Sequence, residues 1–541
     1  MKNPLLLFCL FASLFAPVVR ADSDASILPD GTFEQVDPRT GRPRGWPADT
    51  AVAWPVENGN RFLRIASTAP GEMDKLRLNV DIPSGVRALE LGYRGRVTDL
   101  QRGEKSWYDA RVIINFKNAS GEALGSAPPS YHRNSTTDWR PFTTRFLVPA
   151  GATTLEFMPS LFRVKRGVFD LDDITLRPTD HVALAAELAK KRPPPAPAAE
   201  AADRAKWPAE IIVMGNRLQD RAGREVWLQG VNTASMEWKP AGDSVPASVL
   251  AAIGDWKANV IRLPLKDTYW FGHDEQQKDG GKAYRELVDT IVTLAANRGA
   301  YVVLDLHHYR APKEEHIAFW TDAATRYKNH PAVLFDLLNE PHGISWDVWR
   351  DGGFVSERKA GADEDNFLSD EEKVKAKLGF RSPGMQRMVE VVRATGARNV
   401  IVAGGLDYAY DLSGILKGYA LTDTAEGNGI MYASHIYPWK SDWQGKMLDI
   451  AAHHPILVGE VGADHKRQPW EREENFVQPH TWVPDMLGLI QKHRLNWTGW
   501  CFHPSAGPCM IADWQYTPTT YWGEYAKRAL AGEQFELKRL R

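Results

Sequence analysis

The chain has 541 residues, with 66 basic and 68 acidic side chains and a formal net charge of −2 at pH 7. This length predicts more than one domain, and the balanced charge argues against a nucleic-acid or membrane-surface partner. A hydrophobic content of 43% is ample for large buried cores.

The first residues have the pattern of a cleaved signal peptide. Lys2 precedes an apolar stretch from Leu5 to Val19, and Val19-Arg20-Ala21 places small residues at both positions that determine cleavage. The stretch is too short for a membrane span, and no later stretch approaches that length; an uncleaved anchor is the alternative. We therefore expect residues 1–21 to be removed and the protein to be secreted or periplasmic.

Residues 22–180 predict an all-β domain. Short alternating or apolar runs are separated by turn residues without a convincing helix between them, which favours a β-sandwich. The runs are 88–93, 110–116, 142–148, 154–158 and 169–176.

Residues 181–206 predict a linker. A short Ala/Leu/Lys helix leads into Pro193-Pro194-Pro195-Ala196-Pro197-Ala198-Ala199. Consecutive prolines impose an extended, semi-rigid conformation, so we expect a spacer between two domains.

Residues 207–541 alternate between strand and helix patterns. Eight such strands in about 330 residues predict a (β/α)8 TIM barrel with insertions. The alternative, an open doubly wound sheet, would need a Gly-rich phosphate turn after its first strand, and Gly230-Val231-Asn232-Thr233 does not supply one. The predicted strands are 226–231, 260–264, 301–306, 333–338, 400–403, 429–434, 455–458 and 497–500.

Two glutamates follow or end such apolar runs. They are Glu340, in Asn339-Glu340-Pro341, and Glu460, in Gly459-Glu460-Val461-Gly462. A carboxylate at the C-terminal end of a barrel strand indicates a catalytic role, and glycoside hydrolysis requires two of them. The alternative is a pair of unrelated glutamates that cap helices or pair with arginine.

Other polar or aromatic residues are predicted at the same strand ends. A glutamate nucleophile needs a neighbouring cation such as Arg262 to hold its pKa down, whereas a glutamate acid needs a raised pKa. Asn339 can bond a substrate hydroxyl, and Trp500 can stack under a sugar ring. The predicted strand-end residues are Arg262, His307, His308, Tyr309, Asn339, His435, Tyr437 and Trp500, and the tryptophans that either extend the platform or only pack are Trp270, Trp346, Trp349, Trp439 and Trp443.

Together these motifs resemble glycoside hydrolase family 5, a clan A family that includes many cellulases. The resemblance covers residues 207–541 and implies that Glu340 is the acid/base and Glu460 the nucleophile, without a cofactor or catalytic metal. It further implies that the cleavage subsite is lined by Arg262, His307, Asn339, His435, Tyr437 and Trp500.

Two features depart from the family pattern. The first is a long insertion from His342 to Pro383, which we expect to form a wall of the cleft. The second is a loop after Trp500 flanked by Cys501 and Cys509, the cysteines that remain once Cys9 leaves with the signal peptide. A local disulfide is feasible there, and two free thiols are the alternative.

Residues 22–180 resemble, more weakly, a carbohydrate-binding jelly roll. The resemblance rests on Gly31-Thr32-Phe33-Glu34, Pro43-Arg44-Gly45-Trp46 and Asp172-Asp173-Ile174. It implies a sugar-binding module with room for a structural calcium; the alternative is a spacer that no longer binds sugar.

The sequence thus predicts a secreted retaining β-glycoside hydrolase that cleaves a polysaccharide through two glutamates, with endo-β-1,4-glucanase activity favoured. β-Mannanase or another β-glucan hydrolase is the nearest alternative. A metal-dependent barrel hydrolase using His307, His308, His435 and His503 would need a His-x-His pair after the first strand, which is absent. A non-catalytic sugar-binding protein would not need both glutamates. The polysaccharide, endo or exo action and the oligomeric state stay open.

Overall fold

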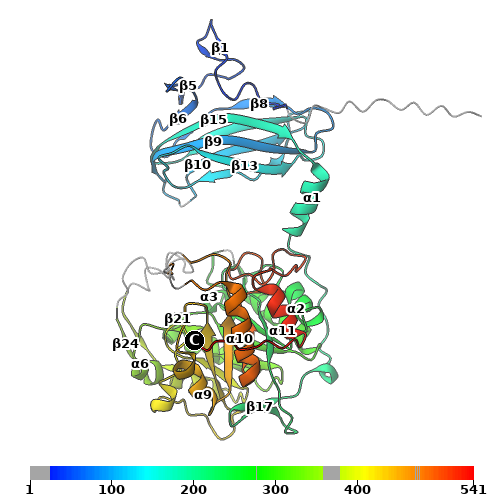
Figure 1. The fold of residues 1–541 in the computed structure, drawn as a ribbon, viewed down its shortest axis with the longest axis vertical. Coiled ribbons are helices and arrows are strands. Elements are labelled where there is room, and N and C mark those ends of the chain that lie inside the picture. Colours follow the sequence, from blue (N-terminus) through cyan, green and yellow to red (C-terminus); the bar gives the residue numbers. More distant parts are fainter. Residues whose placement is uncertain are drawn as a thin grey trace, which may run out of the picture. The chain divides into compact units, whose positions relative to one another are not determined.

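The computed structural model describes residues 25–541 except 106, 276, 357–377, 469–470, 472 and 474–475. The predicted signal peptide and the middle of the predicted cleft wall therefore lie outside the described residues. The chain divides into two compact units, with the division between Ala189 and Lys190 (Figure 1).

The N-terminal unit contains two antiparallel sheets, which confirms the predicted all-β domain. One sheet has the order β11-β10-β14-β7, with β12 beside β10 and β8 beside β14; the other has the order β13-β9-β15-β6-β3. The strands of these sheets are β3 (Val52–Ala53), β6 (Leu63–Ala66), β7 (Met73–Lys75), β8 (Leu78–Asp81), β9 (Ala88–Gln101), β10 (Ala110–Lys117), β11 (Ala123–Ser126), β12 (Ser130–His132), β13 (Arg140–Leu147), β14 (Thr154–Phe162) and β15 (Arg166–Pro178), and the short pairs outside them are β1 (Val36–Asp37) with β2 (Arg42–Pro43) and β4 (Val56–Glu57) with β5 (Asn60–Arg61).

The side chains of these strands alternate between a core and a polar outer surface, as expected for half-buried strands. Along β9, Leu89, Leu91 and Tyr93 are buried in the sandwich core, whereas Glu90 and Arg94 are more exposed. The assignment of this domain as a carbohydrate-binding jelly roll stays a prediction.

The predicted linker is not a free spacer. Its first part is helix α1 (His181–Lys190), and the following segment is bound to the barrel unit: the Pro194 carbonyl accepts a hydrogen bond from Ser244, and Glu200 forms an ion pair with Arg298 at 2.7 Å. Proline keeps this segment extended, but its backbone carbonyls remain available as acceptors, which is why it can attach to a surface.

The C-terminal unit is a closed parallel barrel, which confirms the predicted (β/α)8 fold. Its strand order is β18-β19-β20-β22-β26-β27-β28-β29, and β29 pairs with β18 to close it. Each predicted strand overlaps one of these; the first begins late because Val226 pairs instead with Leu218 of the preceding hairpin. The barrel strands are β18 (Gln229–Asn232), β19 (Val260–Leu265), β20 (Tyr301–Leu306), β22 (Val333–Asp336), β26 (Ile401–Gly404), β27 (Ile430–Ile436), β28 (Ile456–Val461) and β29 (Asn496–Gly499), and the short strands are β16 (Ile211–Met214), β17 (Arg217–Asp220), β21 (Tyr309–Arg310), β23 (Glu340–Pro341), β24 (Gly353–Val355) and β25 (Phe380–Ser382).

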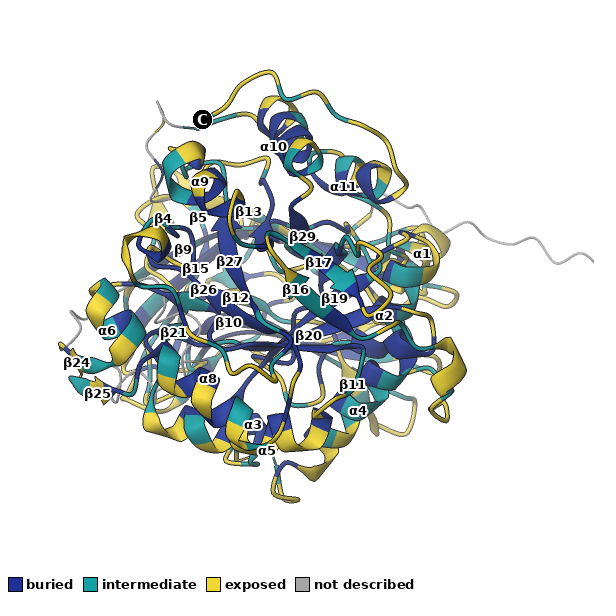
Figure 2. Ribbon diagram, turned by 90° about the horizontal axis from the view of Figure 1, so that it is seen from below, coloured by how far each residue is buried: buried dark blue, intermediate teal, exposed yellow. Residues whose placement is uncertain are grey.

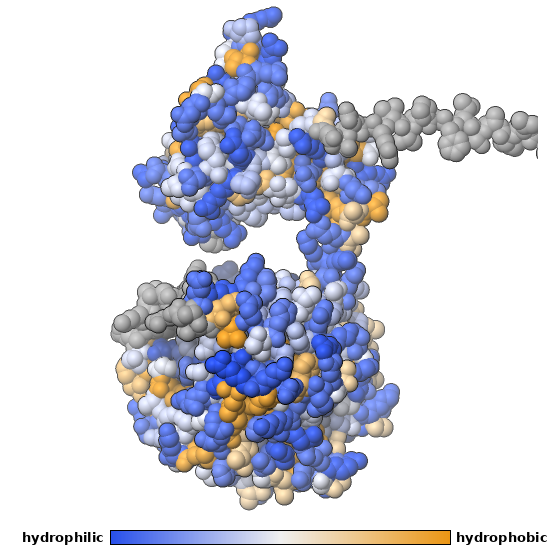
Figure 3. Space-filling view, viewed as in Figure 1, coloured by the Kyte–Doolittle hydropathy of each residue, from blue (hydrophilic) through white to orange (hydrophobic). Residues whose placement is uncertain are grey.

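Helices surround the buried strands, and the outer faces of these helices are exposed, as the yellow sides of α4, α5 and α8 show in Figure 2. Among the described residues, none of the helices combines the length and apolar character that a membrane span requires. The helices are α2 (Val245–Gly254), α3 (Asp267–Trp270), α4 (Lys282–Ala296), α5 (Glu314–Tyr327), α6 (Trp346–Asp351), α8 (Met385–Ala394), α9 (Asp449–Ala451), α10 (Pro479–His493) and α11 (Gly523–Leu530), with short turns η1 (Arg204–Lys206), η3 (Ile415–Lys417) and η4 (Gln444–Leu448). The visible surface of each unit is mainly hydrophilic, with hydrophobic residues in separate small patches (Figure 3).

The barrel interior changes from apolar to polar along the strands, and this change positions the site. An apolar cluster that includes Val260, Val303 and Leu334 fills one layer. Two residues further along the same strands, and therefore on the same face, stand Arg262, Asp305 and Asp336, all buried. The polar layer lies on the C-terminal side of the apolar one, which is the side on which barrel active sites are built. Its residues are Arg262 on β19, Asp305 on β20 and Asp336 on β22.

Cys501 and Cys509 are free thiols, so the feasible disulfide is not formed. The loop between them is closed by backbone bonds instead, from the Cys501 amide to the Pro508 carbonyl at 2.8 Å and from the Met510 amide to the Cys501 carbonyl at 2.9 Å. Burial raises the pKa of both thiols, which keeps them protonated and unreactive.

We expect alkylation of the unfolded, unreduced protein to label both Cys501 and Cys509, because neither is oxidised in the fold. Mass spectrometry of the tryptic peptides measures this, and Tm should be the same with and without reductant. A linked peptide containing both residues would show that the loop carries a disulfide after all.

Candidate active site

Arg262 lies at the centre of the polar layer and contacts three carboxylates. It is completely buried, and its nitrogens lie 3.0 Å from Asp336 Oδ2, 3.1 Å from Asp305 Oδ1 and 3.2 Å from Glu460 Oε1. Burial alone would favour the neutral form of Arg262, but the three carboxylates outweigh it and raise the pKa of the guanidinium. Arg262 is therefore a fixed cation beside one of the two predicted catalytic glutamates.

Two asparagines fix the orientation of this guanidinium. Asn232 Oδ1 accepts from Arg262 Nη1 at 3.0 Å, and Asn339 Oδ1 accepts from Nη2 at 2.8 Å. The Asn232 side chain also donates to the Gly459 carbonyl at 2.9 Å, next to Glu460. Since its oxygen is held by Arg262, the Asn339 side chain presents its NH₂ group to the site, 3.5 Å from His307 Nε2.

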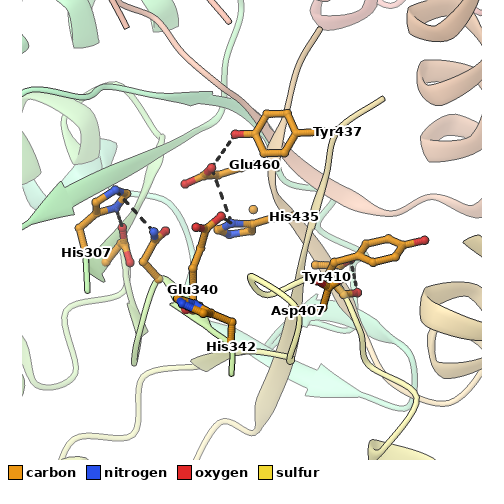
Figure 4. A network of polar contacts seen from close by, with 12 residues as sticks. His307, Glu340, His342, Asp407, Tyr410, His435, Tyr437 and Glu460 are labelled. Atoms are coloured by element: carbon orange, nitrogen blue, oxygen red, sulfur yellow. Dashed lines mark hydrogen bonds and ion pairs between the residues drawn. The ribbon is translucent and has the colours of Figure 1, made fainter. Parts of the chain in front are cut away.

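The two predicted catalytic glutamates both approach Nδ1 of His435. His435 Nδ1 is 3.0 Å from Glu340 Oε1 and 3.6 Å from Glu460 Oε2, and one carboxylate oxygen of each glutamate lies within 4.8 Å of the other (Figure 4). Tyr437 donates a hydrogen bond to Glu460 Oε2 at 2.6 Å. The His435 ring fits against residue 459 because that residue is glycine. A Cβ there would lie only 3.0 Å from His435 Nε2.

The surroundings separate the two glutamates electrostatically. Burial, followed by the charge of Glu460, raises the pKa of Glu340 well above its usual range. Burial also raises the pKa of Glu460, but Arg262 and the Tyr437 hydroxyl oppose that rise. Arg262 therefore lowers the pKa of Glu460, as predicted. Burial has the larger effect, so this pKa is still above the ordinary value. Glu340 is the stronger candidate for a protonated acid and Glu460 for an ionised nucleophile.

The two histidines of the site are neutral. Burial lowers the pKa of His307 to about 3, and burial together with Arg262 lowers that of His435 well below its usual range. His307 is held by Asp305 through a bond of 2.7 Å and stacks on Trp500, with ring centroids 5.7 Å apart. The half-buried Trp500 ring therefore forms one side of the same site.

The structure brings together the two predicted catalytic glutamates and the six residues predicted to line the cleavage subsite, and it adds three residues that had no predicted role. These are Asn232, Asp305 and Asp336, which orient Arg262 or His307. A signal was present for Asp336, because it is a charged residue inside the apolar run 333–338 and would be buried there only with a partner. The role of Asn232 depends on contacts with strands distant in sequence and had no local signal.

Most of the tryptophans considered for the sugar platform belong to the core. Trp270, Trp349 and Trp443 have no exposed surface, so those three are excluded as platform residues because their rings already pack against other side chains. Trp346 is half-buried against Trp349, and Trp439 stacks on Tyr437 with ring centroids 5.0 Å apart. Trp439 is thus the one of the five that borders a site residue.

The histidines of the metal-hydrolase alternative do not gather at one place. His307 and His435 lie at the site, whereas His503 packs against Trp238 and Trp514. His308 lies 2.7 Å from Asp267 and beside His316, and among the described residues this trio is the one group outside the glutamate pair whose atoms are close enough to hold a metal ion. The contact between His308 and Asp267 joins Nε2 to Oδ1.

Tyr437→Phe should lower kcat/KM by about tenfold or more, since a hydrogen bond to a charged group is lost. Without this donor the pKa of Glu460 rises further, so the acidic limb of the pH profile should move to higher pH. Tyr410→Phe is the matched control: Tyr410 also makes a 2.6 Å bond, but to the Ser441 carbonyl, away from both glutamates. A pH profile that shifts equally in both variants would contradict the assignment.

Comparisons with known proteins give consistent matches. A family model described as cellulase (glycosyl hydrolase family 5) matches residues 219–506. The chain is similar to endoglucanase E-5 of Thermobifida fusca, at 22% identity over 54% of this chain and 55% of that protein, and to cellulase CelDZ1 of a Thermoanaerobacterium species, at 24% identity over 60% of this chain and 81% of that protein. The chain thus spans about half the length of the first of these relatives.

Among solved structures, β-glucanase SdGluc5_26A from Saccharophagus degradans in complex with cellotetraose is similar at 22% identity. The match covers 62% of this chain and 97% of that one, with a TM-score of 0.46.

Proposed function

The chain belongs to glycosyl hydrolase family 5, and on that premise we propose that it is a retaining β-glycoside hydrolase that cleaves a β-1,4-glucan. One observation carries the mechanism: a carboxylate oxygen of Glu340 lies within 4.8 Å of one of Glu460. Retaining enzymes place the two carboxyl groups about 5–5.5 Å apart, whereas inverting enzymes leave room for a water molecule at about 6.5–9.5 Å.

In this proposal Glu460 attacks the anomeric carbon while Glu340 donates its proton to the leaving oxygen. A covalent bond to Glu460 forms, the glycosidic bond breaks, and the ionised Glu340 then takes a proton from the water that releases the sugar. The burial difference suits these roles: the Glu340 side chain is 15% exposed and reachable by water, whereas that of Glu460 is 6% exposed.

The remaining side chains supply substrate contacts. The NH₂ group of Asn339 can donate to the hydroxyl beside the anomeric carbon, because its oxygen is already bonded to Arg262. The Trp500 ring offers a stacking surface, and His307 supports that ring from behind. Arg262 and Tyr437 act on Glu460 rather than on the sugar.

The choice of polysaccharide rests on the relatives, which are an endoglucanase and a cellulase. Assays on soluble cellulose, mannan, xylan and mixed-linkage glucan test it, and the highest rate should be on the β-1,4-glucan. A clear preference for mannan would move the proposal to the β-mannanase alternative.

Retention is tested by proton NMR of the first sugars released. The β anomer should appear first and then mutarotate to the equilibrium mixture, because two displacements restore the configuration. Early accumulation of the α anomer would contradict a covalent intermediate on Glu460.

We also propose that the sandwich domain binds polysaccharide and that the protein acts outside the cytoplasm. The motifs shared with carbohydrate-binding modules support the first point, and the signal-peptide pattern of residues 1–21 supports the second. A structural calcium in the sandwich stays a prediction, which metal analysis of the purified protein would test.

A further inference from the structure

Two aromatic side chains of the sandwich are strongly exposed. Trp107 is 51% exposed and Tyr131 is 48% exposed, while the other large hydrophobic residues exposed in its two sheets and their loops, Val56 and Leu147, are aliphatic. A single exposed hydrophobic residue needs no explanation, but two aromatic rings joined through one cluster do. Both rings lie near the start of β10, one in the preceding loop and one on the neighbouring strand β12.

Contacts join these rings into one surface. The Arg111 guanidinium lies 4.9 Å from the Tyr131 ring centroid and 4.5 Å from that of Phe162, and it donates to the Trp107 carbonyl. Phe162 packs edge-on against Tyr108, which in turn packs edge-on against Trp107. Arg111 therefore contacts both the Tyr131 ring and the backbone of Trp107.

The charge at the centre of this surface is paired. Asp109 is completely buried and accepts a hydrogen bond from Arg111 at 2.7 Å. Its second oxygen has no hydrogen bond and lies 3.5 Å from the guanidinium of Arg133, whose side chain is 57% exposed. One carboxylate thus lies between two guanidiniums, and Lys105 Nζ lies 5.0 Å from the Trp107 ring centroid, so N–H groups reach the surface beside both rings.

Two residues near Trp107 in the sequence, Gly103 and Asp109, are held closely to the rest of the domain. A Cβ at Gly103 would lie 2.6 Å from a ring atom of Tyr108 and 2.1 Å from the Arg163 carbonyl oxygen, so only glycine allows this approach. The Phe162 amide donates to the Asp109 carbonyl at 2.8 Å and ties the loop to β14. A surface that is already ordered loses little entropy on binding.

We propose that Trp107 and Tyr131, with Arg133 beside them, form a binding surface for a chain of neutral β-linked glucose units. The two rings stack on sugar faces, and the Arg133 N–H groups and the Tyr131 hydroxyl bond sugar hydroxyls. Trp139, beside the other sheet, is less exposed than Trp107 and Tyr131. The inference rests on the proposed function, since the ligand is the polymer that the barrel would cleave.

Affinity electrophoresis of the full chain in gels with hydroxyethyl cellulose tests the proposal. The double variant Trp107→Ala, Tyr131→Ala should bind the polymer about tenfold more weakly than the native chain. Tyr131→Phe keeps the ring and should lose less, and Val56→Ala, at an exposed position outside the cluster, should bind as the native chain does. The native chain and the three variants should hydrolyse a soluble oligosaccharide at equal rates, because the barrel is unchanged.

The failures can be told apart. If the native chain hydrolyses glucan but is not retarded by the polymer, the sandwich does not bind the polymer. The proposed binding surface is then wrong, although the proposed hydrolase function stands. If the native chain and the double variant are retarded equally, the domain binds elsewhere and the surface assignment is wrong. Stronger retardation by carboxymethyl cellulose, lost in high salt, would show a site for anionic polymers and overturn the neutral ligand. If the single variant Trp107→Ala loses as much retardation as the double variant while its Tm is unchanged, misfolding is excluded as the cause.

Discussion

Glu460→Ala should reduce turnover of a β-1,4-glucan by at least about 10⁴-fold, because it removes the proposed nucleophile. The variant should fold, since Arg262 keeps two other carboxylates, Asp305 and Asp336, as partners. Steady-state hydrolysis of soluble substrate measures the loss. Added azide can occupy the space of the missing carboxylate and should give the inverted α-glycosyl azide.

Glu340→Ala tests whether Glu340 is the acid/base and Glu460 the nucleophile, as proposed. It should hydrolyse ordinary glucans very slowly but still react with an activated aryl glycoside, whose leaving group needs no proton. The trapped glycosyl-enzyme should then be released by azide as the β-azide, with retained configuration. The opposite pair of stereochemical outcomes would show that the roles of Glu340 and Glu460 are exchanged.

A third buried glutamate provides the control for both substitutions. Glu237 lies in the loop after β18, where it accepts a hydrogen bond from the Ser235 amide at 2.7 Å. Burial raises its pKa to about 8, so at pH 7 it is largely protonated and glutamine imitates it closely. Glu237→Gln should therefore keep most of the activity. A loss as large as that of Glu460→Ala would mean that burial, rather than the paired geometry, determines which glutamates matter.

The fold was accessible from sequence because its signal is local. Parallel barrel strands are buried on both faces, so runs such as Tyr301-Val302-Val303-Leu304 are recognisable without any knowledge of their neighbours. The linker was interpreted less well. Its prolines correctly indicated an extended chain, but the bonds of Pro194 and Glu200 to the barrel involve residues about 50 and 98 positions away. No local pattern encodes such contacts.

The site was predictable at the strand ends and not beneath them. Glu340, Glu460 and Arg262 stand in short motifs with a distinctive residue type, so roles could be predicted for them from their expected positions in the barrel. The support given by Asp336 depends on the inward direction of alternate residues along β22, which requires the exact strand register. The sequence also could not show that burial would raise the pKa of Glu460 despite its arginine, because the balance between desolvation and charge depends on three-dimensional packing.

Arg262→Met should lower the free energy of unfolding by about 3–5 kcal/mol, the cost of removing one partner from a buried ion pair. In the native chain this guanidinium is the shared cation of Asp305, Asp336 and Glu460, none of which is exposed to water beyond a few per cent. Without it, three buried carboxylates must either stay charged in an apolar setting or take up protons. Activity should fall as well, since Glu460 would be protonated at neutral pH.

The loss in Arg262→Met should depend on pH with a definite sign. In the native fold burial already raises the pKa of Asp305 and Asp336, with Arg262 opposing, so removing Arg262 raises both further above their values in the unfolded chain. The folded variant then binds more protons than the unfolded chain above the ordinary carboxyl pKa, and its stability falls as the pH rises. Urea unfolding at pH 5 and pH 8 should therefore show the larger loss in the free energy of unfolding at pH 8.

Two further variants serve as controls. Arg262→Lys, which keeps a cation, should recover part of this loss. Arg528→Met, which breaks an exposed pair with Glu533, should match the native protein at both pH values. A deficit in Arg262→Met that is the same at both pH values would indicate lost packing rather than unpaired charge.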